Sequence, residues 1–526
     1  MSEEAVRLTA SPSGATSMVA TSQPLAVETG LSVLQEGGNA VDAAIAMAAV
    51  LTVVEPTGNG LGSDAFAMVW DRGQLHGLNG SGRAPAGWSA ERFAGLERMP
   101  SRGWDSVTVP GAVSAWVDLW RRFGRLNFTR LLEPAISHAE NGFEVTPKIA
   151  ALWARGAGQL FDQPGFADTF MPNGKVPAAG ERFRNPDLAK SLSLIGETEG
   201  RAFYSGALAE RIAAEAARHE AALNIADLGT HQSDWCTPLR MDFRGVRIHE
   251  LPPNGQGIAA LMALGMLEHL PIGLTNAPTV DDFHLQIEAM KIAFADLHRF
   301  VADPLYMDVP PEALLDPDYL RRRAGLISTA FAQDFRAGAP RSGGTVYLTA
   351  ADRTGMMVSL IQSNYSGFGA GVVVPGTGIH LQNRGSGFSL QPGHPNFVGP
   401  GKRPFHTIIP AFVTRGALPL MSLGVMGGPM QAQGHVQMIV LTELFGQLPQ
   451  SAIDASRWRF VDGRRVAVEA GMDESIIAEL AARGHDLERA QLGDDFAFGG
   501  AQIIRVTSEG YVGGSDRRKD GLAAGY

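Results

Sequence analysis

The pattern of the sequence changes near residue 340, and this change limits the folds that the chain can adopt. After that point, short apolar runs are separated by polar turns. The runs are TVYLTA, MMVSLIQ, HTIIPAFVT, PLMSLGVM and AQIIRVT, and the turns include ADRTG, TRGAL and TSEG. Such spacing is typical of antiparallel strands joined by tight connections. The second part of the chain is therefore predicted to be rich in strands.

The part of the chain before residue 340 is dominated by helical patterns. The clearest segment is TVDDFHLQIEAMKIAFADLHRF, in which apolar residues recur at Phe283, Ile287, Met290, Phe294 and Leu297. The segment AVDAAIAMAAVLTVV, residues 40–54, is apolar on nearly all sides and predicts a central helix. Two further candidates are LAERIAAEAARHEAAL and GIAALMALGMLEHL. Helices and antiparallel strands together predict a layered α+β protein.

The composition argues against several classes of protein. A net charge of −10 and a pI of about 5.7 argue against a nucleic-acid partner, which requires basic surface. The single cysteine, Cys236, excludes a disulfide within the chain and a site built from several cysteines. A reactive thiol is an alternative role for Cys236, but His231 and Asp234 have no spacing that indicates catalysis.

The chain is expected to be a soluble cytoplasmic protein that does not enter membranes. Its first residues, MSEEAVRLTASPSGATS, are acidic and have no apolar segment like that of a secretory signal. The most apolar run, residues 40–54, is too short to span a bilayer and contains Asp42.

The stretch SGGTVYLTAAD, residues 342–352, places a threonine directly after two glycines at the start of a predicted strand. A hydroxyl at a new chain terminus can be activated by its own α-amino group. Gly344 has no side chain to obstruct attack on its carbonyl group. We interpret Gly344–Thr345 as a bond that the protein cuts itself, which leaves Thr345 as an N-terminal nucleophile. The alternative is an ordinary strand start. The preceding segment, DFRAGAPRSGG, is predicted to be an exposed loop.

Two other glycine-rich segments offer groups for catalysis or binding. In GVMGG, residues 424–428, backbone N–H groups could converge on an oxyanion; the alternative is a plain glycine turn. In LQNRGSGF, residues 381–388, Arg384 could bind a carboxylate with two hydrogen bonds; the alternative is a surface arginine on a loop.

No motif for a metal or a cofactor is present, and none is expected to bind. The sequence lacks H-E-x-x-H, G-x-x-x-x-G-K-[ST] and G-x-S-x-G, and GNGLGS follows a predicted helix rather than the strand that a dinucleotide site needs. A metal hydrolase is an alternative, but the 13 histidines show no ligand spacing.

Together these segments resemble the γ-glutamyltransferases (glutathione hydrolases) of the N-terminal nucleophile superfamily over nearly the whole chain. The matching segments are GGNAVDAAIA, VPGAVSAW, EAMKIAFAD, GGTVYLTAADRTG, GFGAGVVVPGTGIHLQN, GVMGG and GGSDRRKDGLAAGY. The resemblance implies a four-layer αββα sandwich and self-cleavage into a helix-rich large subunit, 1–344, and a strand-rich small subunit, 345–526. It also implies Thr345 as the nucleophile, Ser363 as the hydroxyl that supports its amine, and Gly427 and Gly428 as oxyanion donors.

The sequence departs from this family where γ-glutamyl enzymes hold the amino acid. Ser81 stands in the place of their arginine, with Arg83 two residues later, and Gly387 stands in the place of their acidic residue. Their paired serines are replaced by His406 and Thr407, and their Gln or Glu by Arg384.

The pattern is similar to the branch of the family that includes oxamate amidohydrolase. We therefore expect a small amide with a carboxylate, held by Arg384 or Arg83 together with Asn383, His406 and Thr407. One alternative is a γ-glutamyl transferase or glutathione hydrolase, and another is a non-catalytic relative with the same fold. Pairs of large and small subunits could further assemble into a homo-oligomer.

Overall fold

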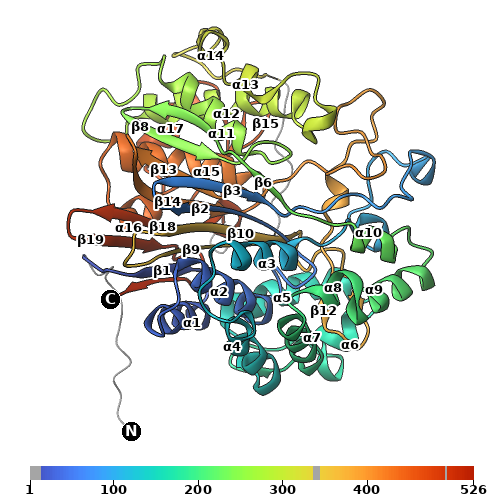
Figure 1. Cartoon of the computed structure of the whole chain (residues 1–526). Helices are drawn as coiled ribbons and strands as arrows, with labels where there is room; N and C mark the ends of the chain where they lie inside the picture. Colours follow the sequence, from blue (N-terminus) through green and yellow to red (C-terminus); the bar gives the residue numbers. More distant parts are fainter. Residues whose placement is uncertain (1–13, 336–343, 492–494) are drawn as a thin grey trace.

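Two large antiparallel sheets face each other in the middle of the molecule (Figure 1). The computed structural model describes residues 14–335, 344–491 and 495–526, so most of the loop predicted over 334–344 lies outside the described residues. In order, the first sheet contains β20 (Leu522–Gly525), β1 (Met18–Thr21), β9 (Gly344–Ala351), β10 (Met357–Tyr365), β2 (Asp64–Asp71), β3 (Gln74–Asn79) and β6 (Asp234–Cys236). The second contains β19 (Gly510–Ser515), β18 (Gly500–Thr507), β14 (Leu418–Met426), β13 (Ala411–Arg415), β8 (Val246–Glu250) and β7 (Leu239–Phe243).

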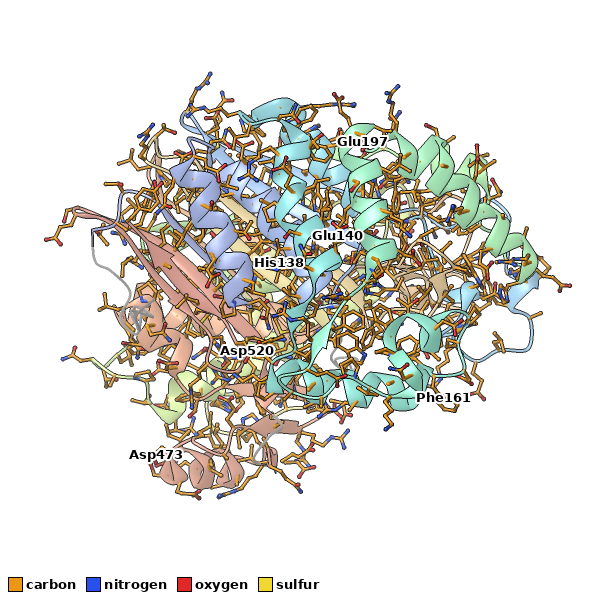
Figure 2. All side chains as sticks on the ribbon, turned by 90° about the horizontal axis from the view of Figure 1, so that it is seen from below. His138, Glu140, Phe161, Glu197, Asp473 and Asp520 are labelled. Atoms are coloured by element: carbon orange, nitrogen blue, oxygen red, sulfur yellow. The ribbon has the colours of Figure 1, made fainter. Side chains whose placement is uncertain are left out.

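Helices cover the outer face of each sheet (Figure 1). The first sheet carries α1 (Pro24–Gln35), α2 (Ala40–Val54) and α3 (Ala112–Phe123), with α4 (Phe128–Asn141), α5 (Pro147–Leu160), α7 (Pro186–Glu197) and α9 (Ala207–Arg218) around them. The second carries α11 (Gly257–Leu267), α12 (Val280–Phe300), α15 (Met430–Ile439) and α17 (Glu474–Ala482). The predicted αββα sandwich is confirmed. Figure 2 shows Glu140 of α4 and Glu197 of α7 on the face that the molecule turns to solvent.

The hydrophobic core is divided into layers by the two sheets. One layer lies between the first sheet and its helices, and another lies between the second sheet and its helices. A third fills the space between the sheets and includes Phe66, Tyr347, Ile361, Phe412 and Ile504. Each sheet therefore buries both faces, which explains why the strands are nearly continuous apolar runs.

The apolar segment 40–54 forms α2, as predicted, and every residue of this helix is buried. Asn39 and Asp42 cap its first turn reciprocally, and the Asp42 carboxylate also accepts hydrogen bonds from the N–H groups of Arg125 and Leu126. Asp42 is thus a capping residue inside the protein. Among the described residues, no helix has the length and apolar character needed to cross a bilayer.

One predicted strand is only partly correct. The run HTIIPAFVT predicts one strand over its whole length, but in the structure β13 begins only at Ala411. His406 and Thr407 do not alternate between the two faces of a sheet; both side chains are buried among polar groups. Pro410, which has no N–H to donate to a ladder, directly precedes the strand.

Strand β9 faces β14 across the interior, and two pairs of positions fix how they are aligned. Thr349 Oγ1 lies 2.6 Å from Ser422 Oγ, and the Tyr347 ring packs where a Cβ atom at Gly424 would be only 2.3 Å away. Two residues further back along β9 and two further on along β14, the same alignment places Thr345 opposite Met426. Gly427 and Gly428 follow directly, so the fold brings them to the same end of the interior as Thr345.

Both predicted subunits contribute strands to both sheets. In the first sheet, β9 pairs with β1, and β10 pairs with β2. In the second, β13 of the later segment pairs with β8 of the earlier one. The segments 1–344 and 345–526 therefore share one set of cores, and neither forms a separate folded unit.

The contact between Gly424 and Tyr347 predicts a loss of stability in Gly424→Ala. The added methyl group would overlap the buried ring, and such overpacking typically costs about 1–3 kcal/mol. Gly158→Ala is the matched control, because this exposed helical glycine has no atom within 4 Å of a Cβ position. Gly158→Ala should be more stable than the wild-type protein by about 0.5–1 kcal/mol. Thermal and urea unfolding followed by circular dichroism would measure both; equal stability of the two variants would contradict the proposed packing.

Candidate active site

Thr345 is buried near the start of β9 and is linked by hydrogen bonds to the carbonyl group that precedes it. Its Oγ1 lies 2.9 Å from Ser363 Oγ, and Ser363 Oγ donates to Gly344 O at 2.8 Å. Since Ser363 has one hydroxyl proton, Thr345 donates to Ser363. Tyr365 N–H also donates to Ser363 Oγ, at 2.8 Å. Ser363 thus connects the candidate nucleophile with the bond that it would attack.

Only glycine fits at the position before Thr345, because a side chain there would collide with its neighbours. A Cβ atom on Gly344 would lie 2.7 Å from Thr57 O and 3.3 Å from Gly58 Cα. The Thr57 carbonyl group is held in place because it accepts a hydrogen bond from Phe368 N–H at 3.1 Å. The close approach of Thr57 is therefore a second reason for glycine at position 344. The first is that glycine leaves its own carbonyl group open to attack.

The loop that follows β10 adopts unusual backbone angles beside Ser363. Tyr365 and Phe368 have φ angles of 76° and 56°, a region that residues with a side chain rarely occupy. Such strain persists only where surrounding contacts enforce it. The Tyr365 ring lies over the Arg384 guanidinium, whose Cζ is 4.5 Å from the ring centroid. The strained residue therefore joins Ser363 to Arg384.

Gly427 and Gly428 form a turn between β14 and α15. Their φ angles are +132° and +60°, which favour glycine. Met430 N–H and Gln431 N–H donate to their carbonyl groups, and the Gln256 side chain donates to Gly428 O at 2.8 Å. In the described part of the chain, no hydrogen bond involves the N–H group of either glycine. The turn therefore offers two donors at the end of the interior where Thr345 lies.

Arg384 lies in a short 3₁₀ turn, Arg384–Gly387, and only 1% of the residue is exposed. Its Nη1 donates to Thr407 Oγ1 at 2.8 Å, while Nε and Nη2 have no partner among the described residues. Burial lowers the pKa of Arg384 to about 10, and Asp64 opposes this shift. The guanidinium is therefore charged at neutral pH and has two donor groups available for an anion.

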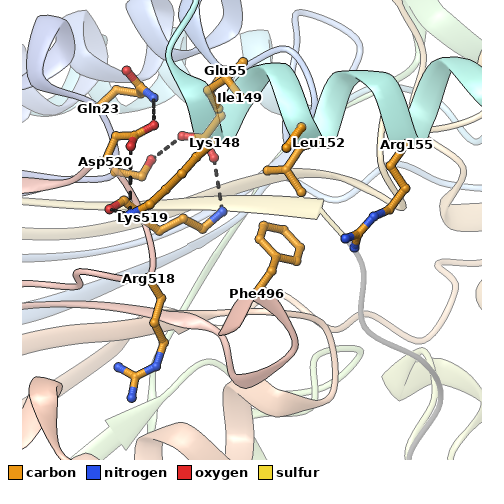
Figure 3. A pocket seen from close by; sticks show the side chains of 12 residues that line it. Gln23, Glu55, Lys148, Ile149, Leu152, Arg155, Phe496, Arg518, Lys519 and Asp520 are labelled. Atoms are coloured by element: carbon orange, nitrogen blue, oxygen red, sulfur yellow. Dashed lines mark hydrogen bonds and ion pairs between the residues drawn. The ribbon is translucent and has the colours of Figure 1, made fainter. Parts of the chain in front are cut away.

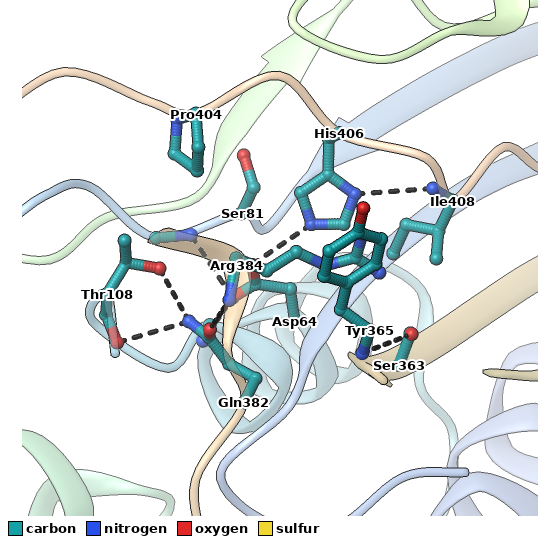
Figure 4. A network of polar contacts seen from close by, with 12 residues as sticks. Asp64, Ser81, Thr108, Ser363, Tyr365, Gln382, Arg384, Pro404, His406 and Ile408 are labelled. Carbon is teal, nitrogen blue, oxygen red and sulfur yellow. Dashed lines mark hydrogen bonds and ion pairs between the residues drawn. The ribbon is translucent and has the colours of Figure 1, made fainter. Parts of the chain in front are cut away.

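Asp64 and His406 form a fully buried pair beside Arg384 (Figure 4). His406 Nε2 lies 3.0 Å from Asp64 Oδ2, and Asp64 Oδ1 accepts from the N–H groups of Gly82 and Gly111. Burial raises the pKa of Asp64 to about 7, against the effect of Arg384. Burial, Arg384 and Arg403 hold the pKa of His406 well below its usual value, so His406 is neutral.

Arg83 is engaged elsewhere. Its guanidinium is 3.5 Å from Asp303 and 3.7 Å from Asp234, and 39% of its side chain is exposed. Of the two arginines considered for a substrate carboxylate, the geometry favours Arg384, which lacks a carboxylate directly bonded to it.

Asn383 and Ser81 make hydrogen bonds that hold loops together. The Asn383 side chain bonds Ser366 N–H at 3.0 Å and Ser101 O at 2.7 Å. Ser81 Oγ donates to Asn79 Oδ1 at 2.7 Å, in the place where γ-glutamyl enzymes have an arginine. The role of Asn383 in binding stays a prediction, and its contacts indicate a positioning role.

Among the described residues, one group could place three ligand atoms around a metal ion: His284, Glu288 and His485. These atoms already have partners. The His284 and His485 rings bond each other at 2.9 Å, and Glu288 is paired with buried Lys291 at 2.7 Å. An ammonium group so close to the carboxylate disfavours a cation, so we interpret the group as a paired polar cluster in the core.

Two other candidates, a cavity and the cysteine, do not lead to catalysis. A cavity of about 190 Å³ beside α5 is lined by Glu55, Lys148, Phe496, Lys519 and others (Figure 3). Its buried charges are paired, because Lys519 Nζ is 3.3 Å from Glu55 Oε1.

Burial raises the pKa of Cys236 to about 12, which leaves a protonated, unreactive thiol.

Sequence reasoning did not identify Asp64, Gln256 or Tyr365 as members of the site. A signal existed for Asp64, since an acidic residue directly precedes the apolar run AFAMVW, and buried carboxylates need partners. The contacts of Gln256 with Thr407 and Gly428 join residues 151 and 172 positions apart. The contacts of Tyr365 depend on its positive φ angle, which no pattern in the sequence indicates.

Three comparisons with known proteins relate this chain to others. The family model described as Gamma-glutamyltranspeptidase matches residues 26–526. The chain is 37% identical to the glutathione hydrolase-like YwrD proenzyme of Bacillus subtilis, over 97% of this chain and 99% of that protein. It is 36% identical to the oxamate amidohydrolase proenzyme of Klebsiella pneumoniae, over 95% and 97%. The crystal structure of a cephalosporin acylase from Bacillus halodurans superposes with a TM-score of 0.93 at 45% identity, covering 98% of this chain and 96% of that one.

The steric limit at residue 344 predicts that Gly344→Ala slows the cleavage that the sequence leads us to expect before Thr345. The new methyl group would meet Thr57 O and displace the carbonyl group from Ser363. Gly367→Ala is the control, since a Cβ atom there comes no closer than 3.9 Å to Thr57 O. Denaturing gels over time should show persistent full-length chain only in Gly344→Ala. Equal rates in the two variants would mean that the close approach does not control the reaction.

Proposed function

Because the chain belongs to the gamma-glutamyltranspeptidase family, we propose that it is a self-processing amidohydrolase with Thr345 as its N-terminal nucleophile. The observation that supports this most directly is the hydrogen-bonded sequence from Thr345 Oγ1 through Ser363 Oγ to Gly344 O, with distances of 2.9 and 2.8 Å. The hydroxyl group and the scissile carbonyl group share one partner, which suits a reaction between neighbouring residues.

In the proposed self-cleavage, Thr345 Oγ1 attacks the Gly344 carbonyl carbon. The Gly344–Thr345 C–N bond breaks, its nitrogen takes up the proton that Oγ1 releases, and an ester of Gly344 with Thr345 Oγ1 forms. Water then hydrolyses the ester. The products are a Gly344 carboxylate at the end of segment 1–344 and a free amine on Thr345, which starts segment 345–526.

In catalysis, the new α-amine of Thr345 accepts the proton of Oγ1 as the oxygen attacks the substrate amide. The unperturbed pKa of such an amine is about 8, close to what a base at neutral pH requires. We assign Ser363 to orient the hydroxyl group and the N–H groups of Gly427 and Gly428 to stabilise the oxyanion. The leaving amine takes the proton that the α-amine accepted, and water then hydrolyses the ester, which releases the acyl group as a carboxylate and restores the Thr345 hydroxyl group.

The substrate that we propose is a small amide bearing a carboxylate, like oxamate. Arg384 supplies a buried cation with two available donor groups, and Thr407 fixes its orientation. Nothing at Ser81 or Gly387 could pair with an amino acid's α-carboxylate and α-amine as γ-glutamyl enzymes do. The similarity to an oxamate amidohydrolase proenzyme supports this choice over the γ-glutamyl alternative. A cytoplasmic location and assembly of subunit pairs remain predictions.

Thr345→Ala should leave a single full-length chain and abolish amide hydrolysis, because the side chain that cuts and then catalyses is missing. Thr345→Ser is the matched variant, since it retains a hydroxyl group and should still mature. N-terminal sequencing of the wild-type small fragment should begin at Thr345. A non-catalytic relative would instead give one uncut chain in all three proteins.

Arg384→Ala should raise KM for oxamate by about one to two orders of magnitude, as expected for the loss of a charge-assisted contact worth about 1.5–3 kcal/mol. Arg83→Ala is the control and should change KM less than threefold, because that guanidinium is bound to Asp234 and Asp303. Steady-state kinetics with oxamate and with γ-glutamyl anilide would test both arginines. Efficient anilide cleavage without oxamate hydrolysis would contradict the proposed substrate.

A further inference from the structure

The guanidinium that faces the proposed substrate already has a buried counter-charge in the protein. Asp64, His406 and Arg384 are each at most 1% exposed and come from β2, the segment before β13 and the 384–387 turn. His406 bonds Asp64, and its neighbour Thr407 bonds Arg384. Consecutive residues thus tie the carboxylate and the guanidinium into one cluster (Figure 4).

Hydrogen bonds define where the protons of this cluster lie in the free enzyme. His406 Nδ1 accepts from Ile408 N–H at 3.3 Å, so the ring proton is on Nε2 and points to Asp64 Oδ2 at 3.0 Å. The other carboxylate oxygen accepts from Gly82 and Gly111 at 3.2 and 3.1 Å. Asp64 therefore receives three donors, an arrangement that suits its ionised form.

The groups that face Asp64 from all sides leave one positive charge for it to balance. His406 and the N–H groups of Gly82 and Gly111 bond Asp64 directly, and the arginines 384 and 403 and Tyr204 interact with it electrostatically. Arg403 is already bonded to the carboxylate of Asp234. Its charge is therefore matched, and Asp64 is the counter-charge that remains for Arg384.

We propose that Asp64 is a specificity-determining residue: it balances Arg384 in the free enzyme and takes up one proton when a substrate carboxylate becomes the anion facing that guanidinium. This inference rests on the proposed function, since it assigns the carboxylate to Arg384. Without proton uptake, two buried anions would share one cation, which is strongly unfavourable. With it, the bound state contains one cation and one anion.

The proton comes from solvent and is held on Asp64 Oδ2. His406 Nε2 then changes from donor to acceptor, its proton moves to Nδ1, and the long contact with Ile408 N–H is lost. The imidazole stays neutral, because a second cation beside Arg384 and Arg403 is disfavoured. Burial, which raises the pKa of Asp64 to about 7, makes the carboxyl group ready to accept this proton near neutral pH.

Asp64 thereby couples affinity to pH. Below its pKa the cluster carries a positive charge and attracts a carboxylate directly. Above the pKa of Asp64, the enzyme must take up one proton from solvent for each carboxylate that binds. The affinity for the carboxylate should therefore fall about tenfold per pH unit. A neutral amide of the same size needs no proton and should bind with no such dependence.

Calorimetric binding of pyruvate to the mature enzyme tests this coupling. Pyruvate keeps the carboxylate and adjacent carbonyl group of oxamate but replaces the amide nitrogen by a methyl group, so it cannot be hydrolysed. Titrations in buffers of different ionisation enthalpy, from about pH 6 to about pH 9, count the protons taken up. We expect nearly one per pyruvate above about pH 8, and a protonated-carboxyl band in the infrared difference spectrum.

Asp64→Asn should remove the carboxyl band and reduce proton uptake to the contribution of the Thr345 amine. Asp118→Asn is the matched control: this half-buried carboxyl group also has a raised pKa but contacts Ser233, and its loss should leave uptake unchanged. If Asp64→Asn does not mature, the infrared difference spectrum of the wild-type enzyme still tests the proposal, because protonation of the Thr345 amine cannot produce a carboxyl band.

Pyruvate binding without the carboxyl band, or no binding at pH 6, would overturn the role of Asp64. The proposed function fails differently: pyruvate would bind with proton uptake, yet oxamate would not be hydrolysed.

Discussion

The contact between β9 and β14 across the two sheets is the constraint on which the rest of the site depends. Thr349 meets Ser422, and Tyr347 fills the space that Gly424 leaves open. Side chains on one face of a strand repeat every two residues, so this alignment also determines which face of β9 Thr345 occupies. A shift by one residue would turn Thr345 toward the helices and away from the Gly427–Gly428 turn. The packing of the core therefore fixes the direction in which the hydroxyl group points.

The place of β9 within its sheet explains how a cut at its first residue could be tolerated. The strand is held by β1 on one side and β10 on the other, with side chains buried on both faces. Apart from the pairing of Gly344 with Tyr365, the β9 residues that pair with β1 and β10 all follow Thr345, so these pairings do not depend on the peptide bond before Thr345. Breaking that bond would free Gly344 while the apolar contacts between segments remain, and these dominate stability.

Much of the fold could be predicted from the sequence because its signals are local. Helix α2 is confirmed over 40–54. Helix α12 coincides with the segment of periodic apolar residues, and α11 coincides with a segment that is apolar on all sides. The Gly344–Thr345 pair was also visible, since steric freedom and a hydroxyl group are properties of adjacent residues. The Asp64–His406 pair was not, because its members are 342 positions apart. The sequence predicts His406 in a strand and at the substrate, and only its buried polar partners explain why the chain is irregular there.

The absence of an acidic residue at 387 has a steric cause as well as a chemical one. A Cβ atom on Gly387 would lie 2.7 Å from Phe405 O, and one on Gly385 would lie 2.4 Å from the Trp88 ring. The turn that presents Arg384 is therefore packed too closely to carry a carboxylate for an α-amine. An exchange of Gly387 for an acid would displace Phe405 and with it the adjacent His406. The close packing that leaves no room for an acidic residue at 387 also keeps the turn that carries Arg384 near Asp64, so under the proposed function the choice of substrate depends on how tightly this turn is packed.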